Sequence, residues 1–198
     1  MDVKTIGVIG AAAKGREIGS AFLIAGFRTV LEDVSPAILD QAVAYIRETL
    51  HHGMASRRLT QAQRAAAIAN LSTAHSVEDV CRQADLLIEA LPEEMELQLE
   101  IFTIFDKFAR THAILASTAS SLSINELAAI TFREENCVGL HFHHPLQDMK
   151  PLEIIRVHET SDATVAACKV VARRMGKEAV VLLDSPEVIS KNISALQK

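Results

Sequence analysis

The stretch that decides the fold runs from Thr5 to Asp33 and reads TIGVIGAAAKGREIGSAFLIAGFRTVLED. Its first apolar run ends at Gly10, and apolar residues at helical spacing follow from Gly15, which predicts a strand, a tight turn and a helix. A second apolar run at residues 29–31 precedes Asp33, which stands 23 positions (33 − 10) after the first glycine. This order and spacing are typical of a βαβ unit that binds a dinucleotide.

The turn after the first strand is expected to bind an anion. Unpaired amide groups and the positive end of the helix dipole attract a diphosphate at a helix N-terminus. Asp33 is expected to accept hydrogen bonds from the adenosine ribose, which favours NAD over NADP. The alternative is a tight turn that serves packing alone. The cofactor contacts expected in the turn are Gly10, Ala12, Ala13, Lys14 and Gly15.

The glycine pattern of this turn departs from the usual one at a single position. Gly10 and Gly15 occupy positions one and six, but position three is Ala12, where the backbone has to approach the diphosphate closely. A methyl group there is expected to cost about 1 to 3 kcal/mol if the turn cannot shift. Lys14 is either a phosphate contact that offsets part of this cost or a solvated side chain. Both interpretations stay open.

Composition restricts the class of protein. The 198 residues are 49% hydrophobic and 23% charged, which suits one domain with a real core, and the net charge of −5 argues against nucleic acid as a partner. No apolar run is long enough to cross a bilayer and no signal peptide is present, so we expect a soluble cytoplasmic protein. The scattered Cys81, Cys137 and Cys168 are predicted to be buried thiols, and no metal site is expected.

Strands and helices alternate along the rest of the chain. Helices are predicted at residues 36–50, 61–67, 77–84, 95–108, from 124 onward and at 162–175, and strands at 71–74, 85–90, 113–117, 137–140, 152–157 and 179–183. HHGM at 51–54 is expected to end its helix, and Thr60 with Gln63 predicts a capping box. The alternation predicts an α/β fold, a Rossmann-type doubly wound and mostly parallel sheet with helices on both faces, over residues 1–184.

Polar residues gather where three of the strands end. These turns are Pro92–Glu94, Ser117–Ser121 and His141–Pro145, and in an open α/β sheet they line one crevice. The chain then returns as a strand carrying Glu153, so contact between His141 and Glu153 is expected. A carboxylate on one imidazole nitrogen leaves the other free to exchange a proton with an alcohol, and Ser120 could donate to the same oxygen. Alternatively, a single histidine is a structural hydrogen-bonding residue.

Five segments together resemble one family. They are GVIGAAAKG, DLLIEALPEEMELQLEIF, ILASTASSLSINELA, VGLHFHHPLQDMKPLEII and GKEAVVLLDSP. They are similar, in this order and over nearly the whole chain, to the NAD-binding domain of L-3-hydroxyacyl-CoA dehydrogenases, which include 3-hydroxybutyryl-CoA dehydrogenases. The resemblance implies an oxidoreductase of fatty-acid or related acyl-CoA metabolism, with reversible hydride transfer between C3 of a 3-hydroxyacyl-CoA and NAD.

The resemblance also implies roles for individual residues. It makes His141 the catalytic histidine, Glu153 the carboxylate that orients it, and Ser120 a contact of both substrate and cofactor. Asp33 and Glu93 fall on acids that contact the two riboses. Four further residues complete the set: Gln98 and His144 stand at cofactor-side positions of the family, and Arg57 with Arg58 matches a helical hairpin that meets the CoA moiety.

Departures from the family cluster at the expected site. They are Ala12, Glu17, Thr118, Ala119, Gln98, His144, Glu187 and Lys191, with Asn192 one position from the expected asparagine. The family continues into a helical second domain, and residues 185–198 are expected to be its truncated start, with a homodimer or a partner chain supplying the rest. Two interpretations therefore stay open: an enzyme of the family, or a non-catalytic relative that binds nucleotide, acyl-CoA or a partner protein.

Overall fold

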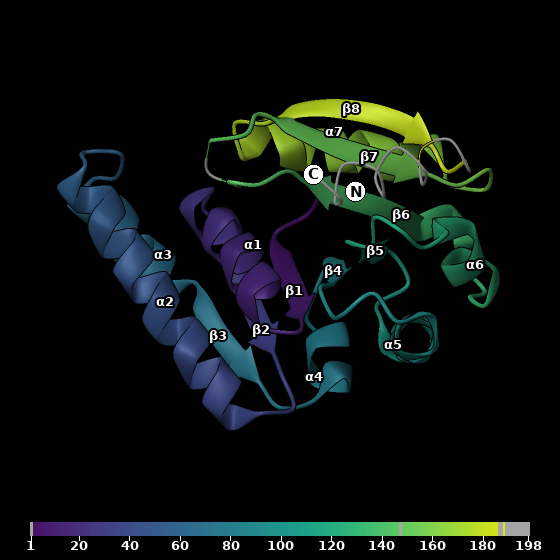
Figure 1. Cartoon of the computed structure of the whole chain (residues 1–198), viewed down its shortest axis with the longest axis horizontal. Helices are drawn as coiled ribbons and strands as arrows, with labels where there is room; N and C mark the ends of the chain where they lie inside the picture. Colours follow the sequence, from purple (N-terminus) through teal and green to yellow (C-terminus); the bar gives the residue numbers. More distant parts are fainter. Residues whose placement is uncertain (1, 147, 186–187, 189–198) are drawn as a thin grey trace.

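A computed structural model of the protein describes residues 2–146, 148–185 and 188. Its centre is an eight-stranded sheet in the order β3-β2-β1-β4-β5-β6-β7-β8 (Figure 1). The strands are β1 Thr5–Ile9, β2 Arg28–Glu32, β3 Leu71–Ala74, β4 Leu86–Glu89, β5 Ile114–Ser117, β6 Cys137–Phe142, β7 Pro151–Arg156 and β8 Glu178–Leu183. Neighbours pair in parallel except β6 and β7, which are antiparallel.

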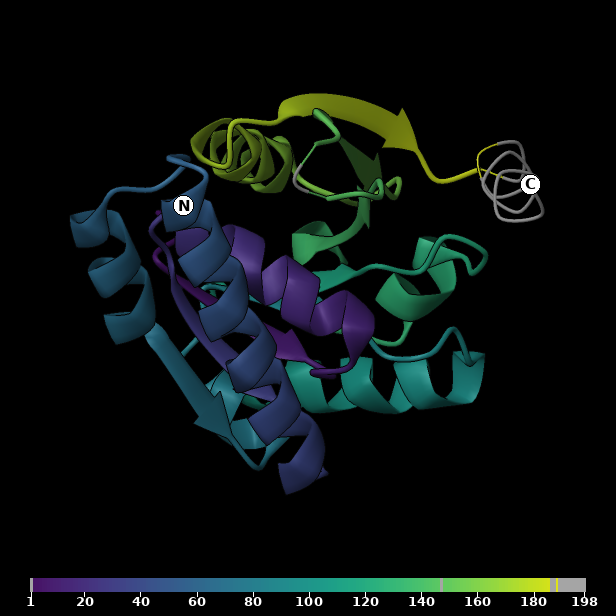
Figure 2. The same ribbon diagram turned by 60° about the vertical axis from the view of Figure 1, so that its left-hand side comes forward.

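Helices cover both faces of the sheet. One hydrophobic cluster holds side chains of α1 Ala13–Ile24, α2 Pro36–Ala55, α3 Gln61–Ala69 and α7 Asp162–Arg174. The other holds side chains of α4 Val77–Cys81, α5 Met95–Phe108 and α6 Ile124–Ala129, and a short 3₁₀ helix spans Glu134–Asn136. Figure 2 shows α2 lying alongside α1, with α7 next to β8. Strands β1, β4 and β5 are buried along their whole length, as a parallel sheet covered on both faces requires. The predicted doubly wound Rossmann-type fold is confirmed.

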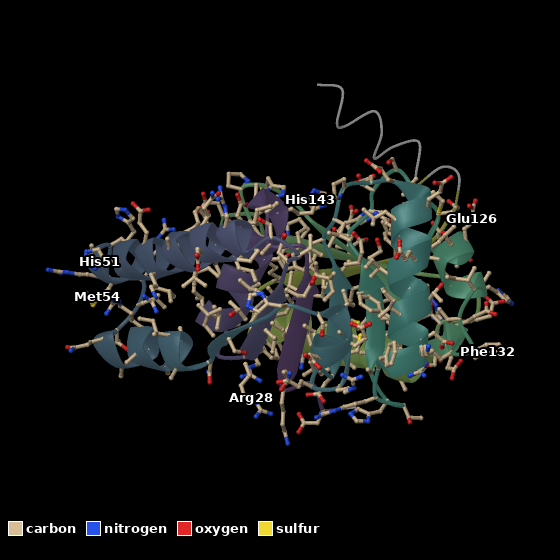
Figure 3. The ribbon with its side chains drawn as sticks, turned by 90° about the horizontal axis from the view of Figure 1, so that it is seen from below. Arg28, His51, Met54, Glu126, Phe132 and His143 are labelled. Carbon is tan, nitrogen blue, oxygen red and sulfur yellow. The ribbon has the colours of Figure 1, made fainter. Side chains whose placement is uncertain are left out.

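The sheet order reverses between β1 and β4, which creates the position for a site. Strand β1 pairs with β2 on one side and with β4 on the other, so the connections that leave β1 and β4 diverge to opposite faces. In open α/β sheets this divergence opens a crevice at the carboxyl ends of the strands. In Figure 3, Arg28 at the start of β2 and His143 just after β6 lie at opposite ends of the strands.

Helix α2 is longer than the sequence predicted. Residues 51–54 were expected to end it, but the helix continues to Ala55, and His51 and Met54 lie near the far end of the α2–α3 hairpin (Figure 3). A Cβ atom on Gly53 would lie 2.9 Å from Leu59 Cδ1, so glycine here lets the hairpin close tightly. This tertiary contact outweighs the low helix propensity of glycine. The predicted capping box of Thr60 and Gln63 at the start of α3 is confirmed.

Two further expectations concern cysteines and the chain end. Cys81, Cys137 and Cys168 are buried and unpaired as predicted, and burial raises the pKa of each thiol to about 12. Most of residues 185–198, including the departures Glu187, Lys191 and Asn192, lie outside the described residues. Among the described residues, the helices are too short or too polar to traverse a lipid bilayer.

Candidate active site

The three polar turns meet in one cavity of about 450 Å³ at the carboxyl edge of the sheet. Glu93 comes from the turn after β4, Thr118 and Ser120 from the turn after β5, and His141 from the end of β6. Lys14 contributes from the first turn of α1. The predicted crevice therefore exists, and it lies where the sheet order reverses.

The loop between β1 and α1 has the shape of an anion cradle. Gly10 adopts a left-handed φ of 91°, and a Cβ atom on Gly15 would lie 1.8 Å from the Gly10 carbonyl oxygen. The first turn of α1 has no side-chain cap and no acidic residue, and Ala12 and Ala13 are exposed. Uncapped helix amides next to a lysine, Lys14, suit a diphosphate. Ala12 has a φ of −65°, an ordinary backbone conformation for a residue with a side chain.

Asp33 is held beside this loop immediately after β2. Its Oδ2 accepts a hydrogen bond from the Ala11 amide at 3.0 Å, and its Oδ1 accepts one from the Ser35 amide at 2.9 Å. The residue is only 8% exposed. Because a carboxylate oxygen accepts more than one hydrogen bond, both oxygens retain capacity for a ribose hydroxyl. The ribose contact itself stays a prediction.

Glu93 ties the turn after β4 to the serine-rich turn. It accepts hydrogen bonds from the amide (3.1 Å) and hydroxyl (2.9 Å) of Ser120, and from the amide (2.9 Å) and hydroxyl of Ser121. Lys14 Nζ lies 3.8 Å from Oε1. Burial raises the pKa of Glu93, but the hydrogen bonds outweigh it and hold that pKa below its usual range. Glu93 is therefore an ionised acid in the cavity wall, and Ser120 donates to it in this structure.

His141 lies inside β6, which runs two residues beyond the predicted end at Leu140. It stands directly opposite Glu153 in the antiparallel ladder, and its Nδ1 lies 3.5 Å from Glu153 Oε2. The other ring nitrogen, Nε2, contacts the carbonyl oxygen of Ala119 in the serine-rich turn. The side chains of His141 and Glu153 are about nine-tenths buried, at 11% and 12% exposed. The expected contact between histidine and carboxylate is present.

Two neighbouring histidines make contacts that the sequence analysis missed. His143 Nε2 lies 3.4 Å from the second oxygen of Glu153, Oε1. His144 Nδ1 lies 3.0 Å from Glu17 Oε2 on α1, so two of the departures from the family pattern pair with each other. The signal available in the sequence for His143 was its place two residues after His141, immediately beyond the end of β6.

Other predicted site residues lie outside the cavity wall. Gln98 is fully buried in α5, and neither atom of its side-chain amide has a hydrogen-bond partner among the described residues. Arg57 and Arg58 stand between α2 and α3, where Arg58 Nη1 lies 3.8 Å from Asp148 Oδ1 in the β6–β7 connection. The cofactor role of Gln98 and the substrate role of the two arginines stay predictions.

Two buried acids lie at the carboxyl ends of the two strands that neighbour β1. Glu32 is the last residue of β2 and Glu89 the last residue of β4, and both pair in register with Ile9 at the end of β1. Burial raises the pKa of Glu89, although the Ser117 hydroxyl donates to it at 2.6 Å. Burial, and then the charges of Asp33 and Glu78, raise the pKa of Glu32 to about 7. Its Oε1 has no hydrogen-bond partner in the described part of the chain. Neither residue was predicted from the sequence as part of the site.

An open sheet with an anion cradle at its switch point defines the class of dinucleotide-binding domains. The sequence pattern described as "3-hydroxyacyl-CoA dehydrogenase, NAD binding domain" matches residues 5–185. The chain belongs to this family, and the family assignment made from the sequence is confirmed. The match also supports NAD as the cofactor.

Among residues 2–146, 148–185 and 188, no cluster of three or more histidine, cysteine or acidic side chains is arranged to hold a metal ion.

Relatives in sequence and structure agree with this assignment. The chain is 35% identical over 191 residues to 3-hydroxybutyryl-CoA dehydrogenase of Bradyrhizobium diazoefficiens, covering 96% of this chain and 65% of the relative. It is 34% identical over 193 residues to the mitochondrial hydroxyacyl-coenzyme A dehydrogenase of Rattus norvegicus, covering 94% and 61%. The crystal structure of (S)-3-hydroxybutyryl-CoA dehydrogenase from Ralstonia eutropha superposes with a TM-score of 0.88 at 33% identity, covering 93% and 65%. The chain thus spans about two thirds of the length of these relatives.

Proposed function

We propose that the chain is the NAD-binding and proton-exchanging part of a 3-hydroxyacyl-CoA dehydrogenase. The reaction is the reversible conversion of a 3-hydroxyacyl-CoA into the 3-oxoacyl-CoA, and bound NAD supplies the hydride acceptor or donor. The observation that carries the proposal is the pair of His141 and Glu153, which is built into the sheet and faces the cavity beside the cofactor loop.

His141 is the group that would exchange a proton with the C3 oxygen. Its Nδ1 faces Glu153, so the proton-exchanging atom is Nε2, which contacts the Ala119 carbonyl in this structure. A substrate oxygen has to take the place of that carbonyl. Glu153 fixes the ring orientation and stabilises the imidazolium that forms when the alcohol is oxidised.

The cofactor would lie along the carboxyl edge of the sheet. The uncapped amides at the start of α1 and the Lys14 ammonium suit its diphosphate, and Asp33 and Glu93 suit its two riboses. Gly10 and Gly15 allow the backbone to form this cradle. His144 and Ser120 line the same cavity.

The acyl-CoA would enter across the same cavity and needs a cover. We place the CoA moiety near Arg57 and Arg58, and we propose that helices following β8, or a second chain in a homodimer or heteromer, close the cavity. Apolar side chains on β8 support this arrangement: Val180 is 41% exposed and pairs in register with Glu153, and Leu183 is 56% exposed. Excluding water strengthens the electrostatic interactions of such a site.

We place the reaction in the cytoplasm.

One observation favours a second candidate function. Glu17 and His144, both departures from the family, pair at the edge of the cavity, and Ala12 stands where the family has glycine. These changes suit a non-catalytic relative that binds nucleotide, acyl-CoA or a partner protein.

A paired measurement separates the two functions. NADH oxidation is followed with acetoacetyl-CoA, and NADH binding is measured directly by calorimetry on the same preparation. Turnover that is lost in a His141→Gln variant supports the dehydrogenase. NADH binding without turnover selects the non-catalytic relative, and absence of both contradicts the assignment of the cavity.

A further inference from the structure

Glu153 has an imidazole at each of its two carboxylate oxygens. His141 Nδ1 lies 3.5 Å from Oε2, and His143 Nε2 lies 3.4 Å from Oε1. His141 is fixed by the β6–β7 ladder, and His143 follows the last residue of β6. The two rings therefore reach the same carboxylate, one at each oxygen.

The carboxylate depends on these two rings. Glu153 is 12% exposed, and within the described residues its charged contacts are the two histidines, with no lysine or arginine ion pair. Its Oε2 has no partner there that meets the full geometry of a hydrogen bond. A buried carboxylate without partners is strongly disfavoured, so each imidazole supplies a large part of the compensation.

One contact alone does not fix the plane of a carboxylate. The terminal torsion of a glutamate side chain is broad, so a carboxylate held at one oxygen rotates freely about the last bond. A second contact at the other oxygen, here His143 Nε2 at 3.4 Å, restricts this rotation and keeps Oε2 facing His141. We propose that His143 is a positioning residue: it holds Oε1 of Glu153 so that Oε2 orients the ring of His141. Its effect on rate rests on the proposed dehydrogenase function, whereas its effect on the His141 ring does not.

The neighbouring histidine does not share this role. His144 is turned to Glu17 on α1, at 3.0 Å, and no contact between it and Glu153 is found among the described residues. His158 is exposed and lies two residues after Arg156, the last residue of β7. It offers a matched control away from the cavity. It is not among the residues that line the cavity.

The test uses three variants of the full chain. His143→Phe keeps a ring of similar shape but removes the donor, His143→Gln keeps a donor nitrogen, and His158→Phe is the control. We expect His143→Phe to lower kcat by about tenfold to a hundredfold with KM and NADH affinity unchanged, since small misplacements of a catalytic group have effects of this size. His143→Gln should recover most of the loss, and His158→Phe should behave as the wild type.

Nitrogen-15 NMR of the imidazoles supplies a readout without substrate. The Nδ1 signal of His141, assigned by its loss in His141→Gln, should move in His143→Phe and return toward its wild-type position in His143→Gln. An unchanged signal and an unchanged kcat in His143→Phe would overturn the proposal, as would equal losses in the Phe and Gln variants. If the wild type shows no turnover, the dehydrogenase proposal fails, and the NMR comparison alone decides whether His143 positions Glu153.

Discussion

His141 and Glu153 face each other across the antiparallel pair β6–β7, with Nδ1 3.5 Å from Oε2. The ladder fixes this relationship, because a slip of one residue would turn Glu153 to the other face of the sheet. Functional groups carried by paired strands are placed more precisely than groups on loops. The proposed chemistry therefore rests on the backbone register, and not on the conformation of a flexible segment.

His141→Gln is expected to lower turnover by about a hundredfold or more, because a general base contributes this much or more. NADH affinity should stay unchanged, since the ring lies beyond the diphosphate cradle. Steady-state rates with acetoacetyl-CoA and calorimetric titration of NADH check the two parts, with His158→Gln as the control. A variant that turns over at the wild-type rate would move the chemistry to another residue.

NADH is expected to bind at least about tenfold tighter than NADPH, because the Asp33 carboxylate repels a 2′-phosphate. The amides of Ala11 and Ser35 fix this carboxylate beside the cofactor loop. Asp33→Asn removes the charge and should reduce the preference. Fluorescence titration of both cofactors against both proteins measures it, and equal affinities in the wild type would remove Asp33 from the site.

Ala12→Gly is expected to strengthen NADH binding by about 1 kcal/mol or more, because the methyl group stands where the diphosphate approaches the backbone. Ala12 is exposed and adopts an ordinary φ of −65°, so the change should relieve a contact with the ligand and no internal strain. Calorimetry measures the affinity, and thermal unfolding shows whether the loop has been destabilised. Unchanged affinity would mean that the loop already accommodates the methyl group.

Glu32 is expected to make stability depend on pH. Its pKa is raised from 4.5 to about 7 in the folded state. Between pH 4.5 and about pH 7, the carboxyl is therefore protonated in the folded state and ionised in the unfolded state. The free energy of unfolding should therefore fall as pH rises through this window, and the difference between about 7 and 4.5 corresponds to about 3 kcal/mol.

Glu32→Gln removes this contribution. The variant should gain stability over the wild type as pH rises from about 5 to about 8, and urea unfolding at several pH values measures the gap. Parallel stability curves for the two proteins would show that Glu32 does not titrate in this window.

Much of the fold could be predicted from local pattern. The bounds of α5 follow from its apolar spacing, and the start of α3 follows from Thr60 and Gln63. The length of α2 could not be predicted, because glycine is needed at position 53 for the close approach of Leu59. That contact joins two elements, and helix propensity contains no information about it.

The sequence predicts those site residues that a single strand or turn places in the site. His141 and Glu153 follow from a strand that returns antiparallel, and Glu93 follows from the turn after β4. The hydrogen bond from Ser120 to Glu93 and the ion pair of Glu17 with His144 each join segments that are far apart in the sequence. Local sequence patterns do not show which distant segments come into contact.

The most direct test of the central claim is a crystal structure of the chain with NADH. We predict the diphosphate on the amides at the start of α1 and the nicotinamide ring in the cavity beside His141. A cofactor bound elsewhere, with this cavity empty, would contradict the account.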